Sequence, residues 1–518
     1  MIRFILFSIG VSLISQSNAQ VISQALLDLN NVEAMVNDGG VFFNDHGNAD
    51  PGYEVPKGSG LNAIFALAFW YGGTDVNGQL KLSAQKYENL TDQFKGPLST
   101  DGTAQASTSS AWANQALFSV TQEEIDYHLA NYMTPGYQPS SAIANWPAHG
   151  DVSVQEDFYL APFVDSDGDG IYNPMTADHP CIRGDKAIYV IMNDKGDLHA
   201  SGGDPIGLEM HYMFYEYVGI PEIENTTFVH LKIINRGVQT LNDFKVSTFL
   251  DADLGFFGDD YFGSDESRNM MFFYNGDNLD EDNAGTPGYQ TAPPAIGLVS
   301  LANDFESIGI TDAGSTAPEF WSNMNARNAS GALWEDPVTM TPTNFMFPSD
   351  PGNVSQPNSE VTLANAPGDR KGIANINLGT LVSFSEYTFD YAVIYNREAG
   401  GDNIQNASGL KNVADAVQDF FDTTFVDDCL LQTAAIDELE EVNFSIHPNP
   451  SVGEFVIALG DDFTDASVMI SDLSGRVVMQ EKELNSTETL IQLDQPSGVY
   501  LVHLTSDGRT TVKRMVLN

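Results

Sequence analysis

Hydrophobic and polar residues alternate with a period of two over several stretches in the middle of the chain. Between Asn225 and Gly237, Val229, Leu231 and Ile233 fall on one side of an extended backbone. Comparable stretches at 186–194, 244–255 and 387–398 are separated by turn residues and not by helices. This spacing predicts a large antiparallel β-sandwich.

Three other patterns add elements to this body. Residues 61–73 form a continuous apolar run that ends in Gly-Gly, which suits a strand buried on both faces. Residues 120–132 predict a helix, because Thr121 and Glu124 have the spacing of a capping box. A second helix is predicted at 402–422 from its apolar face. Residues 276–370 are rich in Gly, Pro, Asn and Asp and predict long loops.

Short alternating strands with Ser-Gly and Asp-Gly turns begin again near Phe444. Their number and length suit a small immunoglobulin-like β-sandwich. We therefore predict a mainly β protein, with a large antiparallel β-sandwich body, a few helices and this second, C-terminal sandwich. The expected parts are a signal peptide (1–19), a mixed, β-rich N-terminal region (20–160), a calcium-loop junction (161–185), a main β-sandwich region (186–430), a linker (431–443) and a C-terminal domain (444–518).

The N-terminal residues predict export, and the charge narrows the possible partners. Arg3, the apolar run 4–14 and the small residues before Gln20 predict a cleaved secretory signal peptide. The chain has 71 acidic and 22 basic residues, a net charge of −49. Such a surface repels nucleic acid and attracts divalent cations. No later stretch is apolar enough for a transmembrane segment.

The sequence "VDSDGDGIYNP" at 164–174 places aspartates at alternate positions before a glycine. Calcium takes six to eight hard oxygen ligands, and this spacing can direct several to one centre. The twelfth position is Thr176 and not the Glu of an EF-hand, so a thrombospondin-repeat-like calcium turn fits better. An acidic, solvated turn without an ion is the alternative. The predicted structural calcium ligands are Asp165, Asp167, Asp169, Ile171, Asn173 and Asp178.

A second acidic cluster lies in "DADLGFFGDDYFGSDE". Asp251 and Asp253 are two residues apart at a predicted strand end and therefore point to the same side. A second calcium site is one interpretation, and a set of turn-capping aspartates on an exposed loop is the other. The candidate ligands are Asp251, Asp253, Asp259, Asp260 and Asp265.

The remaining candidates for chemistry are weaker. Cys181 and Cys429 are the two cysteines, and they either pair as a disulfide in an oxidising compartment or stay as thiols. His199, Glu209 and His211 lack the spacing of a zinc-protease helix and read as ordinary strand residues. The sequence has no nucleophile elbow, phosphate-binding loop or dinucleotide fingerprint. Phe256 and Phe257 stand out because adjacent phenylalanines in a loop must either pack or bind.

The end of the chain resembles the type A C-terminal sorting domain of the type IX secretion system (Por secretion) of Bacteroidota. The resemblance rests on five pieces in order: Pro448-Asn449-Pro450, Gly453 with Phe455, Asp472-Leu473-Ser474-Gly475-Arg476, Ser497-Gly498-Val499-Tyr500 and Lys513-Arg514-Met515-Val516-Leu517. It implies passage across the outer membrane by the secretion machinery. The protein would then be secreted, or attached to surface polysaccharide.

The body resembles uncharacterised cargo proteins of the same system. Among the matching pieces are Trp70-Tyr71-Gly72-Gly73, Trp146-Pro147-Ala148-His149-Gly150, Asp259-Asp260-Tyr261 and Pro367-Gly368-Asp369-Arg370. Ser264 stands where these proteins are expected to carry a cysteine, which removes one possible partner for a disulfide of that group. The resemblance implies architecture and location, but no activity.

Together these features predict a secreted or surface-attached protein, stabilised by calcium, that acts in adhesion or extracellular binding. Extracellular glycans or surface polysaccharide are the expected partners beside the secretion machinery. A secreted hydrolase acting on polysaccharide or peptide is one alternative, and a structural surface-layer or filament subunit is another.

Overall fold

The computed structural model consists of two compact units, residues 1–429 and 430–518. In the first unit it describes residues 22–87, 91–283, 285–312 and 314–424. In the second it describes residues 444–449, 451–459, 466–472, 477–484, 486, 488–493, 495–496, 498–506 and 509–517. The predicted signal peptide (1–19) and linker (431–443) lie outside these described residues.

The larger unit, the body, is built on two large antiparallel sheets. Successive strands of the nine-stranded sheet are β10 (Phe94–Lys95), β14 (Lys186–Asn193), β15 (Leu208–Glu216), β16 (Thr226–Asn235), β27 (Glu386–Asn396), β22 (Ala295–Ser300), β19 (Met270–Asn275) and β18 (Asp260–Asp265), with β11 (Leu117–Thr121) also on β14. Those of the six-stranded sheet are β23 (Ser307–Ile310), β26 (Arg370–Leu381), β17 (Leu241–Ala252), β8 (Ala66–Thr74) and β3 (Val41–Phe42), with β9 (Leu80–Ser83) also on β8.

Smaller sheets complete the body, and the four-stranded one contributes to its main hydrophobic core. A four-stranded sheet contains β1 (Gln24–Leu27), β2 (Glu33–Asn37), β6 (Tyr53–Glu54) and β7 (Asn62–Ile64). The two-stranded pairs are β4 (Asn44–Asp45) with β5 (Asp50–Pro51), β12 (Phe163–Val164) with β13 (His179–Pro180), β20 (Leu279–Asp280) with β21 (Gln290–Thr291), and β24 (Glu335–Asp336) with β25 (Thr341–Pro342).

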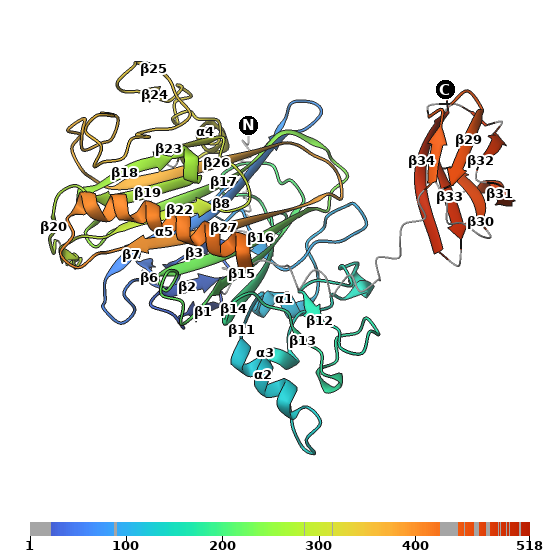
Figure 1. The fold of residues 1–518 in the computed structure, drawn as a ribbon, viewed down its shortest axis with the longest axis horizontal. Coiled ribbons are helices and arrows are strands. Elements are labelled where there is room, and N and C mark those ends of the chain that lie inside the picture. The colour runs from blue at the N-terminus through green and yellow to red at the C-terminus, as the bar shows by residue number, and fades with distance from the viewer. Residues whose placement is uncertain are drawn as a thin grey trace, which may run out of the picture. The chain divides into compact units, whose positions relative to one another are not determined.

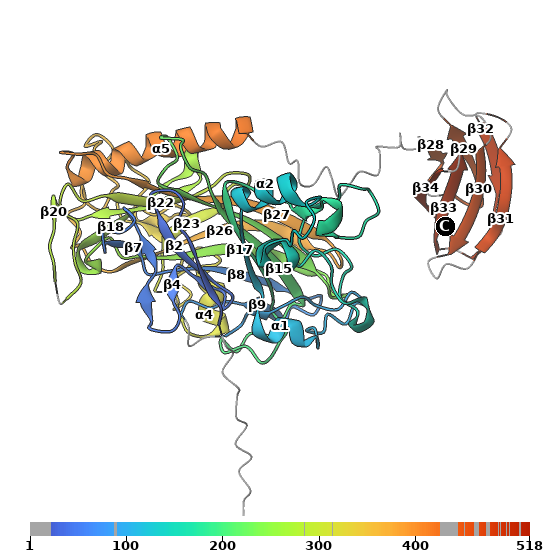
Figure 2. The same ribbon diagram turned by 90° about the horizontal axis from the view of Figure 1, so that it is seen from below.

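The two large sheets share the main hydrophobic core, which confirms the predicted sandwich. Val229, Leu231 and Ile233 of β16 enter this core, as their alternation predicts, and meet residues of β8 and β17. Helix α5 (Asn403–Thr424) covers the other face of the large sheet through Ala407, Leu410 and Val417. Helix α4 (Ala317–Asn323) covers the other face of the small sheet. Figure 2 shows α5 and α4 on opposite sides of the strands.

Strand β8 explains the continuous apolar run at 61–73. Leu67, Phe69 and Tyr71 face the main core, whereas Ala68 and Trp70 face the core beneath α4. Both sides of the strand are therefore buried, and the period of two disappears from its sequence. Because β8 pairs with β17, the N-terminal region and the main sandwich region belong to one compact unit.

The remaining helices of the body are short. Helix α2 (Gln122–Asn131) begins at the predicted capping box: the Thr121 side chain accepts from the Glu124 backbone N–H, and the Glu124 carboxylate accepts from the Thr121 N–H. Helices α1 (Ser110–Asn114) and α3 (Ser141–Ala144) lie nearby in sequence, and Figure 1 shows α2 and α3 below β11. The structure thus confirms both predicted helices.

The C-terminal unit is the second predicted sandwich. One sheet has the order β28 (Phe444–His447), β29 (Glu454–Leu459) and β32 (Glu488–Gln492). The other has the order β31 (Val477–Leu484), β30 (Ala466–Asp472), β33 (Gly498–Ser506) and β34 (Arg509–Leu517). Both sheets contribute to one core, with Phe455 and Ile457 from the first and Val468 and Val502 from the second.

Candidate functional site

The acidic loop at 165–178 connects the two strands of a short hairpin. Pairing of Phe163 with Pro180 brings the loop ends together. Carboxylate oxygens of Asp165, Asp167 and Asp178 lie within 4.8 Å of one another. The local hairpin therefore joins two aspartates at the start of the loop with one at its end.

Hydrogen bonds within the loop hold Asp178 in place. Its two carboxylate oxygens accept from the backbone N–H groups of Ser166 and Asn173, each at 2.8 Å. The side chain is fully buried, and burial raises the pKa of Asp178. Asp165 similarly accepts from the N–H groups of Gly168 and Gly170, each at 2.8 Å.

The other predicted ligands in this loop have different local roles. Asp169 accepts from the N–H of Ile171 at 2.7 Å, and it is not part of the three-carboxylate cluster. The Asn173 side chain caps a short 3₁₀ helix by accepting from the N–H of Met175 at 3.1 Å. The structure therefore brings together Asp165, Asp167 and Asp178 of the predicted set.

This cluster fits a divalent cation. Asp165, Asp167 and Asp178 take part in none of the ion pairs between described residues. Converging carboxylates that form no ion pair repel one another unless a cation or protons neutralise them. Carboxylates are also ligands that calcium prefers.

The second acidic cluster has a different composition from the predicted one. Asp251 and Asp253 lie together, but the third carboxylate within 4.8 Å is Asp369. Lys371 supplies a positive charge there: its Nζ is 3.5 Å from Asp251 Oδ1 and also contacts the Asp369 carboxylate. Tyr87 donates its hydroxyl hydrogen to Asp251. This cluster thus already contains a cation from the protein, and we derive no metal site from it.

The other predicted members of that set, Asp259, Asp260 and Asp265, are not part of the three-carboxylate cluster. Asp260 is fully buried, and burial together with Asp259 raises its pKa. Burial also raises the pKa of Asp259, to about 7. Asp265 is at the far end of β18 and pairs with Arg268 at 3.1 Å and Lys411 at 3.6 Å. Burial acts to raise the pKa of Asp265, but a hydrogen bond from Ser267 and the charges of Lys411 and Arg268 lower it overall.

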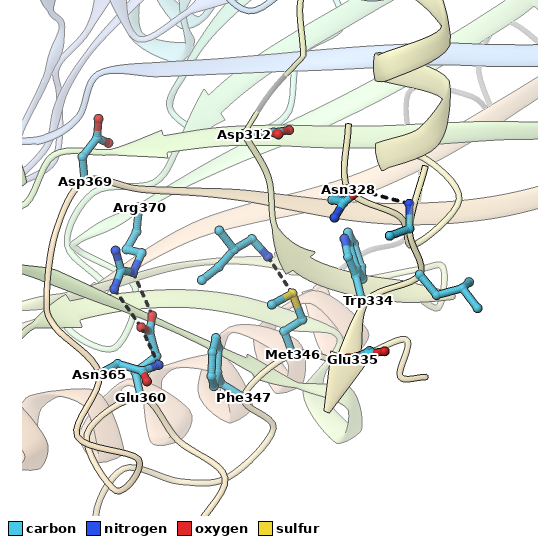
Figure 3. A pocket seen from close by; sticks show the side chains of 13 residues that line it. Asp312, Asn328, Trp334, Glu335, Met346, Phe347, Glu360, Asn365, Asp369 and Arg370 are labelled. Atoms are coloured by element: carbon cyan, nitrogen blue, oxygen red, sulfur yellow. Dashed lines mark hydrogen bonds and ion pairs between the residues drawn. The ribbon is translucent and has the colours of Figure 1, made fainter. Parts of the chain in front are cut away.

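A pocket of about 670 Å³ opens beside the cluster of Asp251, Asp253 and Asp369, and Asp369 is part of its lining (Figure 3). Arg370 forms two contacts with Glu360, Nε to Oε1 at 3.0 Å and Nη2 to Oε2 at 2.8 Å. Glu360 also accepts from Asn365 Nδ2 at 3.1 Å. Figure 3 shows Arg370 turned toward Glu360 and Asn365, with the Asp369 carboxylate pointing away from them. The lining consists of Ile310, Asp312, Asn328, Ala332, Leu333, Trp334, Glu335, Met346, Phe347, Glu360, Asn365, Asp369 and Arg370.

Sequence reasoning missed Asp369, Lys371 and Glu360 as site residues. The antiparallel register of β17 and β26 places Lys371 opposite Asp251. These residues are 120 positions apart, and a single sequence does not give the pairing of distant strands. The motif Pro367-Gly368-Asp369-Arg370 drew attention to this segment through the resemblance to other cargo proteins, but it did not indicate that Asp369 and Arg370 belong to a site.

The predicted histidine and cysteine candidates are not brought together as a metal site. His211 Nε2 lies 2.8 Å from Glu209 Oε1, and Arg236 donates to the same oxygen at 2.8 Å. His199 instead contacts the backbone oxygens of Leu82 and Asp194. Cys181 is buried, whereas Cys429 lies outside the described residues, so their pairing stays a prediction.

Comparison with curated proteins finds no match. Among solved structures, the chain is similar to a polysaccharide lyase at 7% identity and a TM-score of 0.18, over 60% of this chain and 34% of that one. The chain thus spans about a third of the length of that lyase. It is also similar to the BSP domain of a biofilm-associated protein at 9% identity and a TM-score of 0.15, over 96% and 80% of the two chains. At these TM-scores neither likeness bears on fold or function.

The second unit gives a specific match. The family described as the secretion system C-terminal sorting domain matches residues 445–518, in agreement with the predicted domain at 444–518. Such a domain interacts with the secretion machinery and directs a protein out of the cell and to its surface. None of the helices in the described residues is long and apolar enough to cross a membrane. Residues 445–518 therefore form a C-terminal sorting domain of this family, which supports export of the chain by the type IX secretion system.

Proposed function

We propose that the exported body is a calcium-stabilised extracellular binding protein that takes a saccharide of an extracellular glycan or surface polysaccharide into the pocket beside Arg370. The observation that carries this proposal is the lining of that pocket, which combines an apolar floor with many polar groups. Ligand sites typically pair apolar walls with a few fixed hydrogen-bonding groups.

The floor and the rim of the pocket have separate roles in this proposal. Trp334 and Phe347 are buried and supply apolar surface at the floor. Asp312, Asn328 and Glu335 are exposed at the rim, where carboxylates accept hydrogen bonds from hydroxyl groups and amides both donate and accept them. Glu360 already pairs with Arg370, so it helps to hold the site in shape.

Binding is tested with the purified, full-length secreted chain. A glycan array identifies a ligand, and titration calorimetry compares the natural chain with an Asp312→Asn, Glu335→Gln double variant. We expect weaker binding by about tenfold, because hydrogen bonds to two charged groups are lost. Asp197→Asn, an exposed acid outside the pocket, should leave binding unchanged. No glycan binding would contradict the proposal, and release of shortened saccharides would instead support a hydrolase.

The calcium part of the proposal rests on Asp165, Asp167 and Asp178. Binding of calcium to the folded chain at about 100 times its dissociation constant would add about 2.7 kcal/mol to the free energy of unfolding. The Asp167→Asn variant should lose this gain, because it removes one converging carboxylate. Asp169→Asn is the matched control, since Asp169 is exposed in the same loop but outside the cluster.

The experiment compares melting temperatures in calcium and in EDTA, with bound calcium measured by elemental analysis. We expect the natural chain and Asp169→Asn to melt higher in calcium, and Asp167→Asn to respond less. Equal responses of the two variants, or a natural chain without bound calcium, would show that this loop is not the site.

A further inference from the structure

A second cavity, of about 590 Å³, lies between the β4–β5 hairpin and the loop that follows β17. Three carboxylates and two phenylalanines contribute to its lining. None of the described residues that line it is basic. The residues used below are Asp45, Asp50, Phe65, Asp253 and Phe257.

The three carboxylates are held differently. Asp45 accepts from Asn48 Nδ2 at 2.7 Å and from Gln24 Nε2 at 3.2 Å, and these contacts lower its pKa. Asp50 is exposed on the facing strand of the hairpin. Asp253 makes no hydrogen bond or ion pair to another residue in the described part of the chain. The cavity therefore presents carboxylates without a basic residue in its lining, and Lys371 acts on Asp253 only from a distance, since it contacts Asp251 and Asp369.

The aromatic residues give this cavity an accessible apolar wall. The Phe257 side chain is 39% exposed, and its ring lies 5.1 Å from that of Phe256. Phe65 packs edge-on against Tyr87, with 5.7 Å between the ring centroids, and is half-buried. A cation within about 6 Å of such a ring is attracted by its electron-rich face.

The spacing of the carboxylates argues against one small metal ion. Asp253 forms a cluster within 4.8 Å only with Asp251 and Asp369 among the described residues, and neither Asp45 nor Asp50 joins it. A ligand that reaches all three acids of the cavity must be longer than a metal ion. A ligand with an alkyl chain and an ammonium group matches both features of the lining. The alkyl chain can pack on the phenylalanines, and the ammonium group can contact a carboxylate.

We propose that the cavity lined by Asp45, Asp50, Asp253, Phe65 and Phe257 binds a primary ammonium group carried on an alkyl chain. Free diamines and the lysine side chains of peptides share this chemistry. The cavity shares no lining residue with the saccharide pocket or the calcium loop, although Asp253 lies within 4.8 Å of Asp369 from the lining of the saccharide pocket. Neither of those proposals is needed for this one.

The test uses titration calorimetry on the full-length secreted chain in millimolar calcium at pH 9, because burial raises the pKa of Asp253 to about 8 and its carboxylate must be ionised to bind an ammonium group. The probes are 1,5-diaminopentane for a free diamine, Nα-acetyl-lysine amide for a peptide lysine, and uncharged 1,5-pentanediol as the control. We expect at least one amine to bind and the diol not to bind. Tighter binding of the acetylated lysine identifies a peptide source, and tighter binding of the diamine identifies a free amine.

Two variants separate the charge from the aromatic wall. Asp253→Asn should weaken amine binding by about tenfold or more, because a charge-assisted contact is lost. Phe257→Ala should weaken it by about fivefold through the loss of a cation–π contact. Asp197→Asn, exposed elsewhere, should bind as the natural chain does, and circular dichroism checks that each variant is folded.

Three results would overturn the proposal. These are failure of both amines to bind, equal binding by the natural chain and Asp253→Asn, and competitive displacement of the amine by added calcium. The last result would show that the cavity takes a metal ion instead.

Discussion

Replacing Arg370 by leucine should destabilise the body strongly. The Glu360 carboxylate is 1% exposed, and Arg370 is its ion-pair partner through two contacts. Without the guanidinium, a buried carboxylate stays in place with only the Phe262 N–H and the Asn365 amide as donors. Breaking a buried pair from one side costs about 3–5 kcal/mol.

This energy corresponds to a measurable change in melting temperature. The entropy of unfolding is about 2.1 cal/mol/K for each residue, which gives about 0.8 kcal/mol/K for a body of about 400 residues. The Arg370→Leu variant should therefore melt about 4–6 °C lower in differential scanning calorimetry. Adding Glu360→Gln should restore more than half of the loss, because the buried charge is removed with its partner.

An exposed ion pair provides the matched control. Lys232 and Glu386 are 2.7 Å apart, but their side chains are 32% and 62% exposed. Lys232→Ala should change the free energy of unfolding by less than about 1 kcal/mol. If Arg370→Leu melts as Lys232→Ala does, or if Glu360→Gln gives no recovery, the reasoning from burial is wrong.

Three further predictions concern acidity, backbone and export. Burial raises the pKa of Asp253 to about 8, above its value of about 4 in an unfolded chain. In EDTA the free energy of unfolding should therefore fall as pH rises from about 4 to about 8, and Asp253→Asn should flatten that fall in urea titrations at pH 5 and pH 8. An unchanged slope would refute the burial of this carboxylate. Gly255 has a φ of +65°, and an added Cβ would lie 2.1 Å from Asp280 Oδ2. Gly255→Ala should therefore cost clearly more in urea unfolding than Gly136→Ala, whose φ is +86° in open space and whose cost is about 1–2 kcal/mol; equal costs would rule out the contact. Deleting residues 445–518 should leave the body inside the outer membrane in cell fractionation, and export of the shortened chain would contradict the role of the sorting domain.

The sequence was informative where the structure depends on neighbouring residues. The capping box of α2 and the alternation in β16 are local patterns, and both elements formed as predicted. Asp178 could be grouped with Asp165 because one hairpin loop contains both. The C-terminal domain was recognised because its short pieces occur in a fixed order.

The sequence was uninformative where the site depends on strand register. Asp369 and Lys371 reach Asp251 only because β26 lies antiparallel to β17. The prediction grouped Asp265 with Asp251 by their closeness in sequence, but β18 carries Asp265 toward Arg268 and Lys411. Closeness along the chain is therefore a poor guide to closeness in this sandwich, where most strands have partners from distant segments.

The position of β8 also determines when the body can fold. This strand contains no charged residue, and both of its faces become buried, yet its neighbour β17 begins only at Leu241. The loop between them must close before the apolar run is covered, and pairings of such high contact order form slowly. Until then Ala66–Thr74 remains an exposed, aggregation-prone segment of the newly made chain. Changes around this strand should thus affect folding speed as well as final stability.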